Sequence, residues 1–213
     1  MGKRFNVIGA VLVVMMGFSA ARADEPADVR EAAMSFARAL AQGNAEQAHK
    51  FAVSNKTNDT FIDLVAPLAA AETKLHDAAV SRFGKEGASI LTTGTPGEAF
   101  NQKYGKDAGN LEVNIAGDSA QITAKPKPGQ TQSEGQALQL KKVEGKWKVD
   151  LSKLQGIEAM ADNAPRLKAV TKAMADTADE IQAGKYARVQ EAKMAVASKV
   201  KEELSRPQSG AKH

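Results

Sequence analysis

Between residues 111 and 151, apolar and polar side chains alternate, and this pattern constrains the fold more than any other feature of the chain. Alternation with a period of two places one set of side chains on one face of a sheet. We therefore predict a four-stranded antiparallel meander that buries its apolar face. The apolar members are Leu111, Val113, Ile115, Ala120, Ile122, Ala124, Leu138, Leu140, Trp147, Val149 and Leu151.

The connections within this region and the opposite face of the strands support the same interpretation. Gly117 and Gly145 stand in connections short enough for tight hairpin turns. The other face of the sheet is polar, and we expect it to be exposed to solvent. Its members are Glu112, Asn114, Gln121, Thr123, Lys125, Gln139, Lys141, Lys146, Lys148 and Asp150.

Before the sheet, the apolar spacing changes to that of helices. We predict a helix over 28–42, capped by Asp28 and ended by Gly43, then a short helix over 45–52. A long amphipathic helix is expected over 60–83, ended by Gly84. Residues 84–110 are rich in glycine and predict a loop, with one strand around "SILTT". These helices would cover the apolar face of the sheet, giving two layers around one core.

After the sheet, the composition shifts to Ala, Lys and Glu. Apolar stripes predict one helix over 163–182 and a second over 185–204, joined near Gly184 as a helical hairpin. Asn163 would cap the first of them, with Pro165 early in the helix. Residues 206–213 form a polar tail that we expect to be disordered. The hairpin could dock on its own domain or on a partner protein.

The first 23 residues have the parts of a secretory signal peptide. Lys3 and Arg4 precede an apolar run over 7–18, and small residues precede Asp24. The run is shorter than the ~20 residues that span a bilayer, so an uncleaved anchor is the less favoured alternative. We therefore expect a periplasmic or secreted protein that has no membrane span after cleavage.

Charge and cysteine content exclude several classes of function. Without the three basic residues of the first 23, the chain has 26 basic and 25 acidic side chains, too even a balance to predict nucleic-acid binding. The chain has no Cys, which excludes thiol nucleophiles and Cys-based metal sites. No cofactor and no metal site is predicted.

Two stretches resemble the nuclear transport factor 2-like superfamily over residues 28–155. They are "ALAQGNAEQAHKFAV" and the last hairpin, "LQLKKVEGKWKVDLSKL". The resemblance implies an α+β cone: helices packed on one face of a curved antiparallel sheet, often around an apolar pocket. Together with the patterns described above, it divides the chain into a signal peptide (1–23), a cone-like domain (24–155), a helical hairpin extension (156–205) and a tail (206–213). The lysine-rich outer face of the sheet predicts a monomer or weak dimer rather than a tight face-to-face dimer.

Within such a cone, a few side chains could do chemistry or bind a ligand. Glu72 and His76 lie four residues apart on the long helix, and Asp63 lies near its start; His49 and Asp77 are further acid–base candidates. For Glu72, His76 and Asp63 we favour a structural or solvated role, and no catalytic residue is predicted. The residues expected to line a ligand pocket, or to fill the core in its place, are Phe36, Phe61, Leu68, Leu140 and Trp147.

From these observations we expect an exported, non-catalytic binding or accessory protein of the cell envelope. Its partner would be a small apolar ligand or an envelope protein. Two alternatives remain open: a small enzyme of the isomerase or dehydratase kind that uses the cone pocket, and an envelope adaptor that acts through its helical tail.

Overall fold

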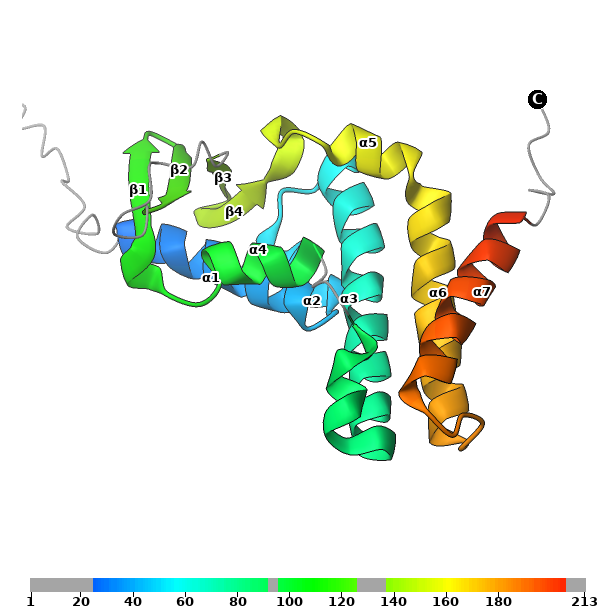
Figure 1. The fold of residues 1–213 in the computed structure, drawn as a ribbon. Coiled ribbons are helices and arrows are strands. Elements are labelled where there is room, and N and C mark those ends of the chain that lie inside the picture. Colours follow the sequence, from blue (N-terminus) through cyan, green and yellow to red (C-terminus); the bar gives the residue numbers. More distant parts are fainter. Residues whose placement is uncertain (1–24, 92–95, 126–136, 206–213) are drawn as a thin grey trace, which may run out of the picture.

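The chain folds into an α+β structure in which helices cover one face of an open four-stranded sheet (Figure 1). The computed structural model describes residues 25–91, 96–125 and 137–205. The predicted signal peptide and the predicted disordered tail both lie outside these residues. No helix within the described ranges is long and apolar enough to span a membrane.

The three helices predicted before the sheet are present, and the first and the third begin a few residues earlier than predicted. They are α1 (Glu25–Ala41), α2 (Ala45–Phe51) and α3 (Lys56–Phe83). Asp28 is not the cap of α1, because the helix begins three residues earlier and Asp28 lies in its first turn. Asn55 caps α3 by accepting a hydrogen bond from the Asn58 N–H at 2.9 Å.

The predicted loop with a strand between α3 and the sheet is wrong. This region instead contains η1 (Gly84–Ile90), α4 (Pro96–Tyr104) and η2 (Ala108–Asn110). Residues 92–95, part of the expected strand and of "TGTPG", lie outside the described ranges. The helix α4 is stabilised here because Phe100 and Tyr104, one turn apart, pack with their rings 4.8 Å apart and contact the main core.

The four predicted strands are confirmed as an antiparallel meander, in the order β1-β2-β3-β4. The strands are β1 (Leu111–Ala116), β2 (Ser119–Ala124), β3 (Leu138–Val143) and β4 (Lys146–Asp150). Gly117 (φ 60°) and Gly145 (φ 76°) adopt the left-handed backbone that the two short hairpin turns need. The apolar face lies against α1 and α2.

Asp150 is the exception on the polar face, since it was predicted exposed and is only 3 % exposed. Its carboxylate accepts a hydrogen bond from the Ser152 N–H at 3.0 Å and lies 2.5 Å from Lys141 Nζ. Burial by itself raises the pKa of Asp150, but these hydrogen bonds outweigh burial and hold the pKa below its usual range. Asp150 is therefore buried because it caps the turn of η3 that follows β4.

After the sheet come η3 (Leu151–Lys153), α5 (Ile157–Asp162), α6 (Ala164–Gln182) and α7 (Val189–Ser205). Pro165 stands early in α6 as predicted, but Asn163 makes no side-chain capping bond and instead donates to the Ala159 carbonyl. In Figure 1, α6 lies along α3, and α7 turns back along α6. The predicted helical hairpin thus packs on its own chain through α3.

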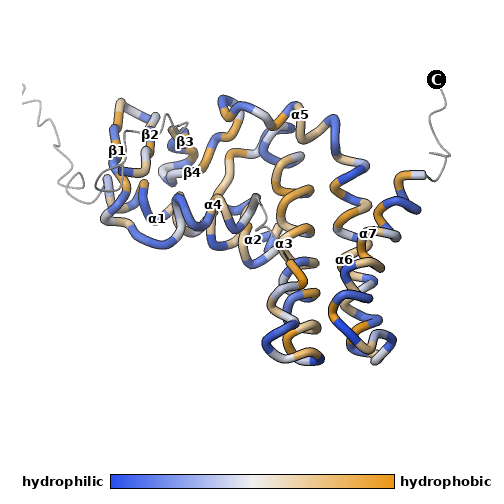
Figure 2. Tube along the Cα trace, in the orientation of Figure 1, coloured by the Kyte–Doolittle hydropathy of each residue, from blue (hydrophilic) through white to orange (hydrophobic). Residues whose placement is uncertain are grey.

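Two hydrophobic clusters form, where the sequence predicts one core. The main core joins the sheet to α1, α2, α4 and the N-terminal half of α3. A second cluster joins the C-terminal half of α3 to η1, α6 and α7; its buried members include Leu75, Ile90 and Ile181. We call this second region the helical arm. Figure 2 shows hydrophobic positions along both α3 and α6.

The helical arm depends on one close backbone approach. Gly87 in η1 lies so near α3 that a Cβ atom there would stand 2.1 Å from the Ala79 carbonyl oxygen. Only a residue without a side chain fits at that distance. Gly87, one of the glycines that favoured a loop in the sequence, therefore allows η1 to pack closely against α3.

Candidate binding groove

The five residues predicted to line a pocket or fill the core are all buried, between 0 and 6 % exposed. Phe36, Phe61, Leu140 and Trp147 belong to the main core, where the Phe36 ring lies edge-on to Phe100 at 5.6 Å. Leu68 is buried on α3. None of the five lines the groove described next.

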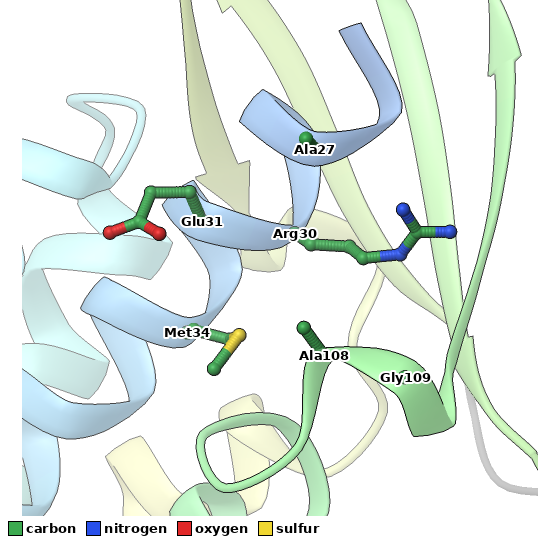
Figure 3. Close-up of a pocket in the computed structure, with 6 residues that line it drawn as sticks. All are labelled: Ala27, Arg30, Glu31, Met34, Ala108 and Gly109. Carbon is green, nitrogen blue, oxygen red and sulfur yellow. The ribbon is translucent and has the colours of Figure 1, made fainter. Parts of the chain in front are cut away.

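A groove of about 430 Å³ lies on the surface between the first turns of α1 and the short helix η2 (Figure 3). We call it the α1–η2 groove. Its walls are mostly small or apolar, with one cation and one carboxylate at the rim. The lining residues are Ala27, Arg30, Glu31, Met34, Ala108 and Gly109.

Arg30 joins the groove to the edge of the sheet. Its Nε donates a hydrogen bond to the Leu111 carbonyl at 3.2 Å, at the first residue of β1. In Figure 3 the guanidinium extends toward the strands, whereas Glu31 points in the other direction and Met34 lies between them at the groove. The interior of the groove is therefore lined by the Met34 thioether, methyl groups and the aliphatic stem of Arg30.

The far wall of the groove is shaped by Asp107. One carboxylate oxygen accepts from the Gly109 N–H at 2.8 Å, and the other accepts from Asn110 Nδ2 at 2.7 Å. These bonds fold residues 108–110 into a single helical turn just before β1. An Asx turn therefore sets the position of Ala108 and Gly109 opposite α1.

The start of α1 is held to the sheet by a second contact. Lys142 Nζ on β3 lies 2.6 Å from Glu25 Oε1 and 5.5 Å from the centre of the Trp147 ring. The Glu25 carboxylate is 18 % exposed and stands in the first turn, where a negative charge also stabilises the helix. The α1 wall of the groove is thus fixed by ion pairing and by a cation–π contact.

Of the acid–base candidates, the structure brings His49 and Asp63 together. His49 Nε2 lies 3.1 Å from Asp63 Oδ1, and His49 Nδ1 lies 3.3 Å from Asp59 Oδ1. The three side chains are 36, 66 and 43 % exposed, respectively. Because α3 begins at Lys56, Asp63 stands in its second turn rather than at its start as predicted, and Asp59 is the acidic residue of the first turn. This cluster ties α2 to α3 at the surface.

The pair predicted on α3 has a different setting. His76 is 44 % exposed, and its Nδ1 lies 3.3 Å from Asp77 Oδ1. Glu72 is half-buried and lies on the part of α3 that enters the helical arm. Neither residue lines the α1–η2 groove. Among the described residues, no group of three or more His, Asp or Glu side chains is arranged to hold a metal ion.

Asn58 is a structural residue that the sequence did not reveal. It is fully buried in the first turn of α3, where Nδ2 donates to the Val53 and Val149 carbonyls at 2.7 and 3.0 Å. Its Oδ1 accepts from the Leu151 N–H at 2.9 Å. One amide therefore joins the linker before α3 to the last strand. The Asn-x-x-Asn spacing indicates Asn55 as the helix cap, but it gives no indication of the bonds that the Asn58 side chain makes.

The helical arm has its own polar cluster around Glu180. Its carboxylate lies 2.5 Å from Lys185 Nζ and 2.6 Å from Lys199 Nζ, and it accepts a hydrogen bond from the Tyr186 hydroxyl. Hydrogen bonds from Lys185, Lys199 and Tyr186 lower the pKa of Glu180 to about 2. Burial and the bond to Glu180 raise the pKa of Tyr186 to about 12. The cluster fixes the turn between α6 and α7.

Comparison of the chain with protein-family models, with curated proteins and with solved structures gave no match. The functional interpretation therefore depends on the residues and geometry of the chain itself. Sequence reasoning missed the groove because the signal for it is diffuse: four positions of α1 and the Asp-Ala-Gly-Asn turn have no motif in common. The Asx signature of that turn was the only local indication.

Proposed function

We propose that the chain is an exported, non-catalytic binding protein of the cell envelope and that the α1–η2 groove is its ligand site. The observation that carries this proposal is the contrast between core and groove. The large side chains of the fold pack against one another, whereas the groove opens to solvent beside Met34 and Ala108. Its volume lies within the range of small-molecule sites.

The lining favours a small apolar ligand with a polar end. Met34 has a flexible, polarisable side chain that adapts to irregular apolar shapes. Ala27 and Ala108 leave room above them because their side chains are single methyl groups. Arg30 and Glu31 stand at the rim, where a polar group of the ligand would lie near them and near water.

The methionines provide a direct test of binding. After removal of residues 1–23, the chain contains Met34, Met160, Met174 and Met194, of which only Met34 lines the groove. With ¹³C-methyl methionine labelling and n-hexanol as the probe, we expect the Met34 signal to shift in a saturable manner. The other three signals should stay in place. A Met34 signal that does not respond, or four signals that move together, would contradict the proposal.

A filled groove gives the matched comparison. Ala108→Phe places a ring in the groove and should abolish the response of Met34 to the probe. Ala159→Phe makes the same change at an exposed position on α5, away from the groove, and should leave the response intact. Melting temperatures of both variants near that of the wild type would show that the effect comes from the groove.

Export is tested separately. We expect the intact mass of the protein from the periplasm or medium to correspond to a chain beginning at Asp24. Full-length chain confined to the cytoplasm would contradict export without bearing on the groove.

A further inference from the structure

The two edge strands of the sheet, β4 and β1, differ in how many of their outward-facing backbone groups are hydrogen-bonded by other parts of the chain. At the β4 edge, the Val149 carbonyl accepts from the Val53 N–H at 2.8 Å and from Asn58 Nδ2. The Leu151 N–H donates to Asn58 Oδ1. Residues 52–58 therefore occupy this edge and use its outward-facing backbone groups.

At the β1 edge, the register shows which backbone groups point outward. The turn after β1 has two residues, and Ala116 pairs with Ser119 across it. In an antiparallel ladder, alternate residues bond to the neighbouring strand. Glu112, Asn114 and Ala116 therefore bond to β2, so the backbone groups of the residues between them face the free edge. The hydrogen bond from Arg30 to the Leu111 carbonyl fits this alternation.

Arg30 uses only the first outward carbonyl of β1. Within the described part of the chain, no hydrogen bond reaches the outward N–H and C=O groups of Val113 and Ile115. Both side chains are only half-buried, whereas Leu111 at the start of the strand is 1 % exposed. The helices thus bury the beginning of β1, whereas Val113 and Ile115 pack against the main core but stay partly exposed.

The strand has few of the features that normally protect an edge. Its six residues include one charge, the exposed Glu112, but no Lys and no Pro, and its pairing with β2 runs without a bulge. Proteins usually protect such edges with charges, prolines or bulges, because a flat unpaired strand is a template for another strand. An edge with so little protection, whose outward-bonding residues Val113 and Ile115 are β-branched, is therefore suited to strand addition.

We propose that β1 pairs antiparallel with β1 of a second copy of this chain, around a two-fold axis at Asn114. In this register Val113 lies opposite Ile115 of the second copy, and the reverse pair follows by symmetry. The four free N–H and four free C=O groups of the two copies all point across the axis, and they form four hydrogen bonds. The bond from Arg30 to Leu111 is kept. An axis at Val113 would instead require the Leu111 carbonyl that Arg30 already uses.

Side chains fit the same register. On the polar face, Asn114 lies opposite itself and can form an amide–amide hydrogen bond, while Glu112 lies opposite Ala116 and no like charges meet. On the apolar face, the Val113–Ile115 pairs cover side chains that one copy leaves half-exposed. Because a single short strand adds little area, the dimer is weak and its population depends on concentration.

Sedimentation velocity of the purified protein over a wide concentration range tests the pairing. Wild type should move from monomer toward dimer as the concentration rises. Val113→Pro removes an N–H that faces the free edge and leaves the β1–β2 ladder intact, so this variant should stay monomeric.

Charge complementation tests the register itself and avoids any proline effect on folding. Asn114→Lys and Asn114→Asp place like charges across the axis, and each should dimerise about fivefold more weakly than wild type. Mixed together, the two variants should form a heterodimer at least as well as wild type does. The same pair of substitutions at Gln121, an exposed position on β2, is the matched control and should change nothing.

Two results would overturn the proposal. One is a wild-type chain that stays monomeric at every concentration, which would leave the β1 edge to an extended segment of a different protein. The other is a dimer that the Asn114 variants leave unchanged but that Met194→Lys disrupts, which would place the interface on the exposed face of α7.

Discussion

Replacing Asn58 by Ala should cost about 3 kcal/mol of unfolding free energy. The substitution removes three hydrogen bonds, but the three carbonyl and N–H partners are not equally affected. The Val149 carbonyl keeps its bond from the Val53 N–H at 2.8 Å. The buried Leu151 N–H and the part-buried Val53 carbonyl lose the Asn58 partner, and an unsatisfied buried polar group costs about 1–3 kcal/mol. A loss of this size is a large part of the 5–15 kcal/mol that is typical of a domain.

Urea unfolding followed by the fluorescence of Trp147, the only Trp in the chain, measures this loss. Asn114→Ala removes an exposed amide and should change stability by no more than about 0.5 kcal/mol. Asn58→Asp keeps the acceptor for Leu151 but turns a carboxylate oxygen toward two carbonyls. It should therefore be less stable than Asn58→Ala at neutral pH and recover in acid, where a protonated carboxyl can donate. An Asn58→Ala variant as stable as wild type would refute the reasoning.

Three further predictions concern packing and pH. Gly87→Ala should lower the free energy of unfolding by about 2–3 kcal/mol, because the new Cβ would overlap the Ala79 carbonyl. In Gly109→Ala, the control, the Cβ meets only one atom, at 3.2 Å, and thermal melts should show a change of less than about 1 kcal/mol. Because Glu180 has a pKa of about 2 in the folded chain against 4.5 in the unfolded one, its stabilisation is complete above pH 4.5 and is lost as the pH falls toward 2; Glu180→Gln should flatten this part of a stability–pH curve. Asp150→Asn should lower the urea midpoint at pH 7 and lose this deficit in acid, since the pKa of Asp150 is lowered and only the ionised form pairs fully with its lysine.

The sheet could be predicted from the sequence because alternation is a local signal. Leu138, Leu140, Trp147 and Val149 are all buried, as the period of two requires. The two hairpin turns could also be predicted locally, from Gly117 and Gly145. A two-residue turn needs a left-handed backbone conformation, which glycine adopts most easily. The long helix α3 could also be predicted from the sequence, because its apolar residues recur at helical spacing over many turns.

The features that could not be predicted depend on contacts between distant parts of the chain. Asn58 reads as an ordinary polar residue near a helix start, and only the approach of β4 makes it buried and fully bonded. The position of Asp150 in β4 places it on the polar face of the sheet, but the turn of η3 that follows the strand buries its side chain. Gly87 suggests a loop until α3 is placed against it. The groove likewise exists only once Ala108 lies opposite α1.

The most direct test of the proposed function is native mass spectrometry of the chain purified from its own cell envelope. We predict a mature chain beginning at Asp24 with a small bound molecule that is absent from Ala108→Phe and retained by Ala159→Phe. A bare chain, or a bound molecule that Ala108→Phe retains in full, would contradict the assignment of the α1–η2 groove as the ligand site.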